Sequence, residues 1–141
     1  MSTQIRPFAS VLERLKTVGL RPTRQRLALL RLLGEGGDRH LTAEALHEEA
    51  RGAGIAVSLA TVYNTLHQFT AAGLLREVVV EAGRSYFDTN TSAHHHFLHE
   101  DTGRLVDIPN DRVRVAELPT PPEGTAISGV EVIVRLASTN R

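Results

Sequence analysis

The chain has 141 residues, of which 41% are hydrophobic, and it carries 16 basic and 16 acidic residues. This length suits one ordinary domain or two very small ones, and the composition excludes a disordered or fibrous protein. No apolar run approaches the roughly 18 residues that cross a bilayer. The N-terminus also lacks the pattern of a secretion signal. We therefore expect a cytoplasmic protein with no membrane partner.

Cysteine is absent and histidine occurs seven times. Disulfides and a structural zinc held by four cysteines are therefore excluded, and any metal must use nitrogen and oxygen ligands. Charge is unevenly distributed, because residues 81–141 hold 6 basic and 9 acidic side chains while the first 26 residues are strongly basic. A basic front half joined to an acidic rear half is typical of a nucleic-acid module followed by another module.

Helical periodicity dominates the first half of the chain. Apolar residues recur at helical spacing over 8–18, 23–33, 42–51 and 58–72, and glycines follow each run. Thr23, Thr42 and Ser58 stand where N-caps are expected. Strands are then expected over 75–80 and 85–88, with a turn over 81–84. Helices followed by a hairpin predict a winged helix.

A small polar segment, residues 89–93, is expected to be a hinge between two domains, 1–88 and 94–141. Beyond it, strands are expected over 94–99, 104–108 and 130–136, and a short helix over 111–118. The predicted fold class is therefore α+β, with an N-terminal winged helix-turn-helix followed by a small second domain.

The helix over 58–72 has the pattern of a DNA-reading helix. It has an apolar stripe behind and small hydrogen-bonding side chains in front, which is what a major groove accepts. Periodicity alone favours an ordinary surface helix, but the upstream arginines and the downstream hairpin shift the balance towards DNA. The candidates for DNA contact are Arg21, Arg24, Arg26, Ser58, Thr61, Tyr63, Asn64 and Arg84.

Three consecutive histidines, His94, His95 and His96, form the second candidate site. Strand alternation would put His94 and His96 on one face and His95 on the other. A histidine pair completed by a carboxylate, such as Asp88, suits Fe²⁺, Zn²⁺ or Mn²⁺, and an exposed imidazole can also ligate haem iron. No catalytic motif is found, so we do not expect an enzyme; a hydrolytic metalloenzyme is the weakest alternative.

Three segments resemble the ferric uptake regulator family: Gly-Leu-Arg-Pro-Thr-Arg-Gln-Arg at 19–26, Ser-Leu-Ala-Thr-Val-Tyr-Asn-Thr-Leu at 58–66, and Ala-Gly-Leu-Leu at 72–75. The resemblance implies a winged helix followed by a small α/β dimerisation domain that also senses the ligand. It further implies a homodimeric repressor that binds AT-rich palindromic operators in double-stranded DNA. Arg21 matches the family's minor-groove cation and Tyr63 its base-contacting tyrosine, whereas Asn64 stands where many members have arginine.

The resemblance also implies a sensor site for a divalent metal. Its ligands match His40, Asp88, His94 and His96. The second metal site of the family is broken, since Ala93 and Val130 stand where histidines are usual. His99 and Thr102 stand at the positions where many members have their first Cys-x-x-Cys pair. The structural zinc site of those members therefore cannot form here.

The chain lacks cysteine and contains His94-His95-His96-Phe97. In these features it is most similar, within the family, to the iron response regulator subgroup. This similarity implies binding of haem at His94, His95 and His96, with DNA released when haem accumulates. One alternative is a co-repressor that binds DNA only when loaded with Fe²⁺, Mn²⁺ or Zn²⁺. Another is a haem- or metal-binding protein that does not bind DNA.

Overall fold

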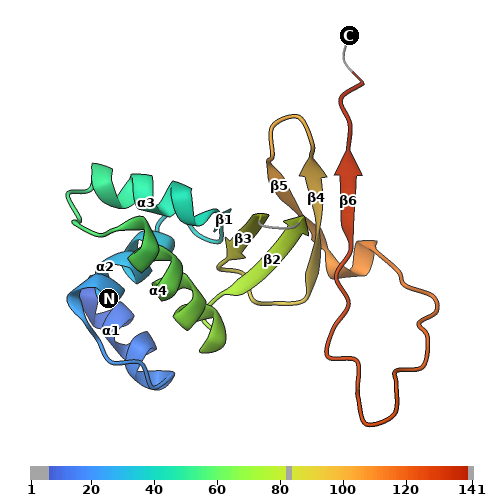
Figure 1. The fold of residues 1–141 in the computed structure, drawn as a ribbon, viewed down its shortest axis with the longest axis horizontal. Coiled ribbons are helices and arrows are strands. Elements are labelled where there is room, and N and C mark those ends of the chain that lie inside the picture. The colour runs from blue at the N-terminus through green and yellow to red at the C-terminus, as the bar shows by residue number, and fades with distance from the viewer. Residues whose placement is uncertain (1–6, 82–83, 140–141) are drawn as a thin grey trace, which may run out of the picture. The chain divides into compact units, whose positions relative to one another are not determined.

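The computed structural model describes residues 7–81 and 84–139, which divide into two compact units, 1–91 and 92–141 (Figure 1). In the described part of the chain, no helix combines the length and the apolar character needed to cross a membrane. Each unit has its own sheet.

Helices make up most of the first unit. They are α1 (Pro7–Thr17), α2 (Arg24–Leu33), α3 (Ala43–Gly52) and α4 (Leu59–Ala71). The side chains of Thr23, Thr42 and Ser58 accept a hydrogen bond from the backbone N–H three residues later, so each caps a helix as expected. The predicted helices are confirmed, with ends within a residue or two of those expected.

The wing is the antiparallel pair β2 (Arg76–Glu81) and β3 (Arg84–Asp88), as predicted. Residues 82–83, in the middle of the predicted turn, lie outside the described residues. The short strand β1 (His40–Leu41) pairs antiparallel with β3 and gives the order β1-β3-β2. The sequence analysis did not predict β1, because two residues are too few to show an alternating pattern.

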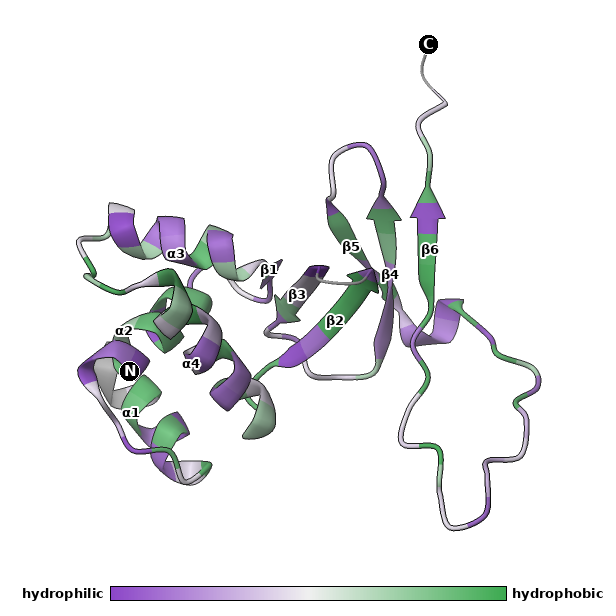
Figure 2. Cartoon of the chain, viewed as in Figure 1, coloured by the Kyte–Doolittle hydropathy of each residue, from purple (hydrophilic) through white to green (hydrophobic). Residues whose placement is uncertain are grey.

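One hydrophobic core holds the first unit together, and the apolar faces of its helices turn towards it (Figure 2). Most of the apolar stripe of α4 is buried in this core, while Tyr63 and Asn64 on the same helix are exposed. This division is what an amphipathic helix requires. It leaves the polar face of α4 available to a partner. The buried members of the stripe are Val62, Leu66 and Phe69.

The second unit is built on β4 (His94–His99), β5 (Leu105–Pro109) and β6 (Ile133–Leu136). Strand β4 is central, antiparallel to β5 and parallel to β6. A 3-10 turn, η1 (Asn110–Arg112), follows β5. These strands confirm the predicted ones at 94–99 and 104–108.

The helix predicted over 111–118 is wrong. Only the η1 turn forms, and Val113 after it has the extended angles φ −123° and ψ 126°. Val113 and Val115 are β-branched, and Pro119 follows, so the segment has weak helical preference. The strand predicted over 130–136 is shorter, because the N–H of Val132 donates to His95 Nδ1 and regular pairing begins at Ile133.

The core predicts a sharp contrast between two valines. Val62 is fully buried on α4, and Val79 on the wing is 58% exposed. We expect Val62→Ala to lower the free energy of unfolding by about 1–3 kcal/mol. Val79→Ala should change it by about 0.5 kcal/mol or less. Urea unfolding of both variants checks this, and equal losses would contradict the assigned core.

Candidate functional site

The three consecutive histidines are divided between the two faces of β4, as their alternation predicted. His94 and His96 face Asp107 of β5, while His95 Nδ1 accepts a hydrogen bond of 2.9 Å from the N–H of Val132. His94 and His96 are almost completely buried, at 4% and 0% exposure. The chain therefore holds two imidazoles on one face and uses the third to fasten the segment that leads into β6.

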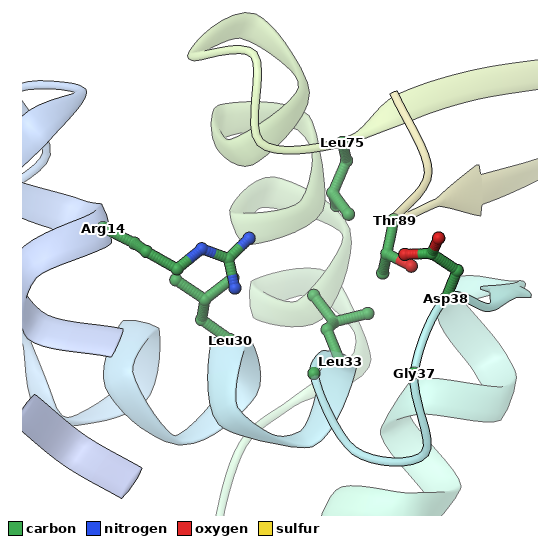
Figure 3. A pocket seen from close by; sticks show the side chains of 8 residues that line it. Arg14, Leu30, Leu33, Gly37, Asp38, Leu75 and Thr89 are labelled. Carbon is green, nitrogen blue, oxygen red and sulfur yellow. The ribbon is translucent and has the colours of Figure 1, made fainter. Parts of the chain in front are cut away.

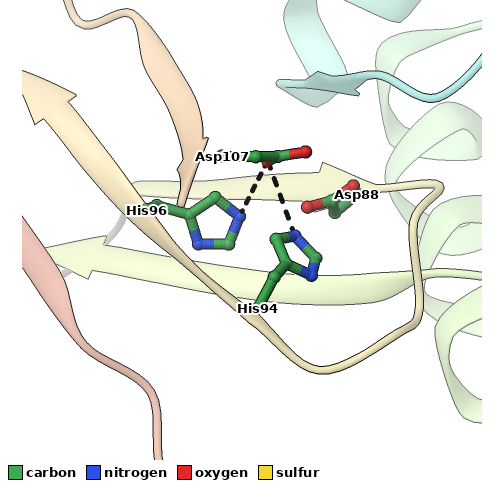
Figure 4. Close-up of side chains that lie close together, drawn as sticks. All are labelled: Asp88, His94, His96 and Asp107. Carbon is green, nitrogen blue, oxygen red and sulfur yellow. Dashed lines mark ion pairs between the residues drawn. The ribbon is translucent and has the colours of Figure 1, made fainter. Parts of the chain in front are cut away.

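The two imidazoles converge on one carboxylate. Asp107 Oδ1 lies 3.5 Å from Nε2 of His94 and 3.5 Å from Nε2 of His96 (Figure 4). The two imidazole rings meet edge to face, with centroids 4.6 Å apart. One ligand atom of each of the three residues lies within 4.8 Å of the others. A single small ion would fit among donors so placed.

The tautomer of His94 is fixed by the backbone. Its Nδ1 lies 2.6 Å from the carbonyl oxygen of Ser92, which can only accept, so Nδ1 carries the proton and donates. The lone pair is then on Nε2, the atom that faces Asp107. Such a hydrogen bond behind an imidazole is the usual support of a metal ligand. Two imidazole nitrogens and a carboxylate suit Fe²⁺, Mn²⁺ or Zn²⁺.

Asp107 was missed by the sequence analysis. It lies directly opposite His96 in the β4–β5 pairing, where side chains share a face. A signal was present: the Gly-containing turn at 101–103 joins two predicted strands, and folding them back on that turn pairs position 96 with position 107. Asp107 is also a charged residue between the buried Leu105 and Ile108.

His40 and Asp88 both lie in the first unit, and there they are neighbours. They are Cα partners in the β1–β3 pairing, so their side chains share one face of that sheet. Asp88 is almost fully buried, and its Oδ1 accepts a hydrogen bond of 2.9 Å from the N–H of Asn90. The structure thus places two further possible ligands side by side, at the end of β3.

The burial of the three histidines also affects whether haem could bind to them. Axial ligation needs an imidazole that a large planar ring can approach, and His94, His95 and His96 are at most 5% exposed. His95 is in addition engaged with the Val132 N–H. The arrangement of these histidines favours a small metal ion.

The candidate reading helix α4 presents Tyr63 and Asn64 to solvent. The hydroxyl of Tyr63 donates to Glu44 of α3 at 2.8 Å, and its ring stacks on His67 with centroids 6.4 Å apart. The hydrogen bond to the Glu44 carboxylate raises the pKa of Tyr63 above its ordinary value. At the start of α4, Ser58 caps the helix and donates to Thr61 Oγ1, so these two hydroxyls are engaged with each other.

The predicted arginines differ in their contacts. Arg26 donates twice to Oε1 of Gln68 on α4, at 3.2 and 3.0 Å, and once to the carbonyl oxygen of Arg21, at 2.8 Å. It therefore fastens the loop that carries Arg21 to α4. The side chains of Arg21 and Arg24 are exposed. Arg84 begins β3 and pairs with Glu81, whose carboxylate raises the pKa of Arg84.

A cavity of about 220 Å³ also opens in the first unit (Figure 3). Leu30, Leu33 and Leu75 line its apolar part, and Arg14 and Asp38 bring opposite charges to it. It contains none of the predicted site residues. No cluster of nucleophilic or metal-binding groups lines it in the described part of the chain.

Residues 17–134 match the model of the ferric uptake regulator family. The chain belongs to this family. A relative from Shigella flexneri, a ferric uptake regulation protein, is 35% identical over 104 residues, which are 73% of this chain and 70% of the relative.

Solved structures of the family have the same fold. The ferric uptake regulator from Pseudomonas aeruginosa with manganese is 27% identical, covers 92% of this chain and 98% of its own, and has a TM-score of 0.69. The ferric uptake regulator from Vibrio cholerae is 25% identical, with a TM-score of 0.71 and coverage of 89% and 98%. This likeness confirms the α+β fold, with a winged helix followed by a small second domain.

The cluster predicts the effect of neutralising Asp107. We expect Asp107→Asn to weaken Mn²⁺ binding by about tenfold or more, because an amide replaces a charged oxygen ligand. Asp101→Asn, in the exposed turn of the same hairpin, is the matched control. Titration followed by the electron paramagnetic resonance of free Mn²⁺ gives both affinities. Equal affinities would remove Asp107 from the site.

Proposed function

We propose that this protein is a homodimeric transcriptional repressor whose affinity for DNA is set by a divalent metal, Fe²⁺, Mn²⁺ or Zn²⁺. The observation that carries this proposal is the convergence of His94, His96 and Asp107, two imidazoles and a carboxylate on one hairpin. It supports metal binding in a member of a family whose relatives include a regulator of ferric uptake and a regulator solved with manganese.

We further propose that His40 and Asp88 belong to the same ligand set. Their side chains share a face in the β1–β3 pairing, and only residues 89–93 separate Asp88 from the start of β4. A bound metal would supply positive charge that draws these donors together, and ligands from both units would limit the motion of the hinge.

The proposed domains are then residues 1–88 for binding DNA, residues 89–93 as the hinge, and residues 94–141 for dimerisation and ligand sensing.

The DNA-binding part of the proposal assigns α4 to the major groove. Tyr63 and Asn64 are its exposed readers, and the Arg26–Gln68 contact holds the Arg21 loop beside α4 so that Arg21 can enter the neighbouring minor groove. Arg24 and Arg84 would contact phosphates, which position the protein but do not specify sequence. Ser58 and Thr61 would act at the N-terminus of α4, where a helix favours phosphate.

A homodimer presents two copies of α4 related by twofold symmetry, which is why we propose a palindromic, AT-rich operator. A DNA-binding repressor of this kind acts where a bacterial chromosome lies, in the cytoplasm. The proposal gives the protein no enzymatic activity.

The alternative is the haem-responsive form of the iron response regulator subgroup, which the chain resembles in lacking cysteine and in its three consecutive histidines. In that form DNA is bound without ligand and released by haem. The burial of His94, His95 and His96 weighs against it. The sign of the ligand effect on DNA binding separates the two forms.

The deciding experiment measures fluorescence anisotropy of a labelled AT-rich palindrome at one fixed salt concentration, since salt alone shifts such affinities greatly. Protein is titrated with chelator, with Mn²⁺ and with haem. We expect Mn²⁺ to tighten binding. Binding by metal-free protein that haem abolishes would establish the haem form instead, and binding under none of the conditions would reject the DNA assignment.

Two variants test the DNA interface. Arg21→Ala should weaken binding most at AT-rich operators, because the variant loses a cation that gains from the concentrated negative potential of their narrow minor groove. Tyr63→Ala should cost about 1–3 kcal/mol and relax base preference at one position of each half-site. Arg112→Ala, in the second unit, is the control. Wild-type affinity in both variants would contradict the interface.

A further inference from the structure

The strand that carries His40 is very short. β1 has 2 residues, His40 and Leu41, and its pairing with β3 consists of His40 opposite Asp88 and Leu41 opposite Phe87. A glycine pair, Gly36 and Gly37, precedes it, and both have positive φ. A ladder this short is weak by itself. Something else must hold His40 beside Asp88.

The next rung of the ladder provides that support. Arg39 lies opposite Thr89, and its N–H donates to Thr89 Oγ1 at 2.8 Å. The N–H of Thr89 donates to the Arg39 carbonyl oxygen at 2.9 Å, and the Thr89 hydroxyl donates to the same oxygen at 3.1 Å. Thr89 directly follows Asp88 and Arg39 directly precedes His40. These hydrogen bonds therefore lock the two proposed ligands into register.

The side chain of Arg39 extends in the other direction, to the helices. Its guanidinium forms an ion pair with Glu49 of α3 and donates to the carbonyl oxygen of Leu32, at 3.4 Å, near the C-terminus of α2. A cation is favourable at that end of a helix. Arg39 and Glu49 are only partly exposed, which limits the screening of their attraction by water. One residue thus joins the β1–β3 rung to two helices.

Those helices belong to the body that presents α4. Helix α3 packs against α4 and α2 packs against α3, and all contribute to one hydrophobic core. Glu44 of α3 in addition accepts from the exposed Tyr63 of α4. A displacement of β1 would therefore reach α3 through the Arg39–Glu49 pair.

We propose that Arg39 is a positioning residue that couples the metal ligands to the DNA-reading helix. It fixes His40 against Asp88 through Thr89, and it transmits the position of β1 to α2 and α3 through Leu32 and Glu49. This inference rests on the proposed function, because it takes His40 and Asp88 as metal ligands. Coupling of two sites is a ratio of affinities, and the ratio is the same seen from either site.

The test compares the affinity for a labelled AT-rich palindrome with chelator and with saturating Mn²⁺. The ratio of the two is the coupling factor. We expect Arg39→Gln and Thr89→Val to lower it about 5-fold or more, a change within the usual range of allosteric coupling. Thr89→Ser keeps the hydroxyl and should retain the wild-type factor. The matched control is Arg51→Gln, which removes the exposed Arg51–Glu48 pair on the same helix α3.

A purely structural role gives a different result. Arg39→Gln would then lower the melting temperature and weaken both DNA affinities equally, leaving the coupling factor unchanged, and that outcome overturns the proposal. Should Arg39→Gln fail to fold, Thr89→Val and Glu49→Gln decide the question by the same ratio. By linkage, the ratio of the Mn²⁺ affinities measured with and without DNA must equal the coupling factor of the same variant. A wild-type coupling factor of 1 would reject the proposed function itself, and this inference with it.

Discussion

The pairing of β4 with β5 is the constraint on which the candidate site depends. Antiparallel register sets Asp107 directly across from His96, and the two-residue period of a strand brings His94 onto the same face. Burial of these imidazoles beside one carboxylate would be costly without compensation. The Ser92 carbonyl oxygen supplies part of it by accepting from His94, which leaves the lone pair of His94 facing Asp107.

Alternation also gives His95 a different task from its neighbours. It accepts from the Val132 N–H on the opposite face and so ties the irregular segment before β6 to the central strand. A run of three identical residues thus contains two possible ligands and one structural anchor. The distinction is geometric, since the three side chains have the same chemistry.

In the first unit, arginines join separate elements of the fold. Arg26 holds the Arg21 loop to Gln68 of α4, and Arg39 holds β1 to α3. A planar guanidinium with several donors can serve two or three acceptors at once, which lysine cannot do with the same geometry. The exposed face of α4 is presented by these contacts together with the buried core behind it.

Local signals explain which elements the sequence predicted well. Helices α1 to α4 follow from apolar spacing, from the caps Thr23, Thr42 and Ser58, and from the glycines that follow, all of which act within a few residues. The incorrect prediction of a helix over 111–118 rested on local signals of the same kind, which are weaker in that segment. There, Val113 continues as extended chain and the η1 turn ends at Arg112.

The sequence by itself determined the order of the four helices and the two wing strands, the amphipathic character of α4 and the face shared by His94 and His96, because each depends on local spacing. Tertiary structure alone decided that Asp107 meets both imidazoles, that His40 lies opposite Asp88, and that Arg39 reaches Glu49. These contacts depend on strand register and on the packing of helices. Both arise between separate elements of the fold, and the spacing of residues within one element does not fix them; for Asp107, the turn at 101–103 gave a hint that only the strand register made definite.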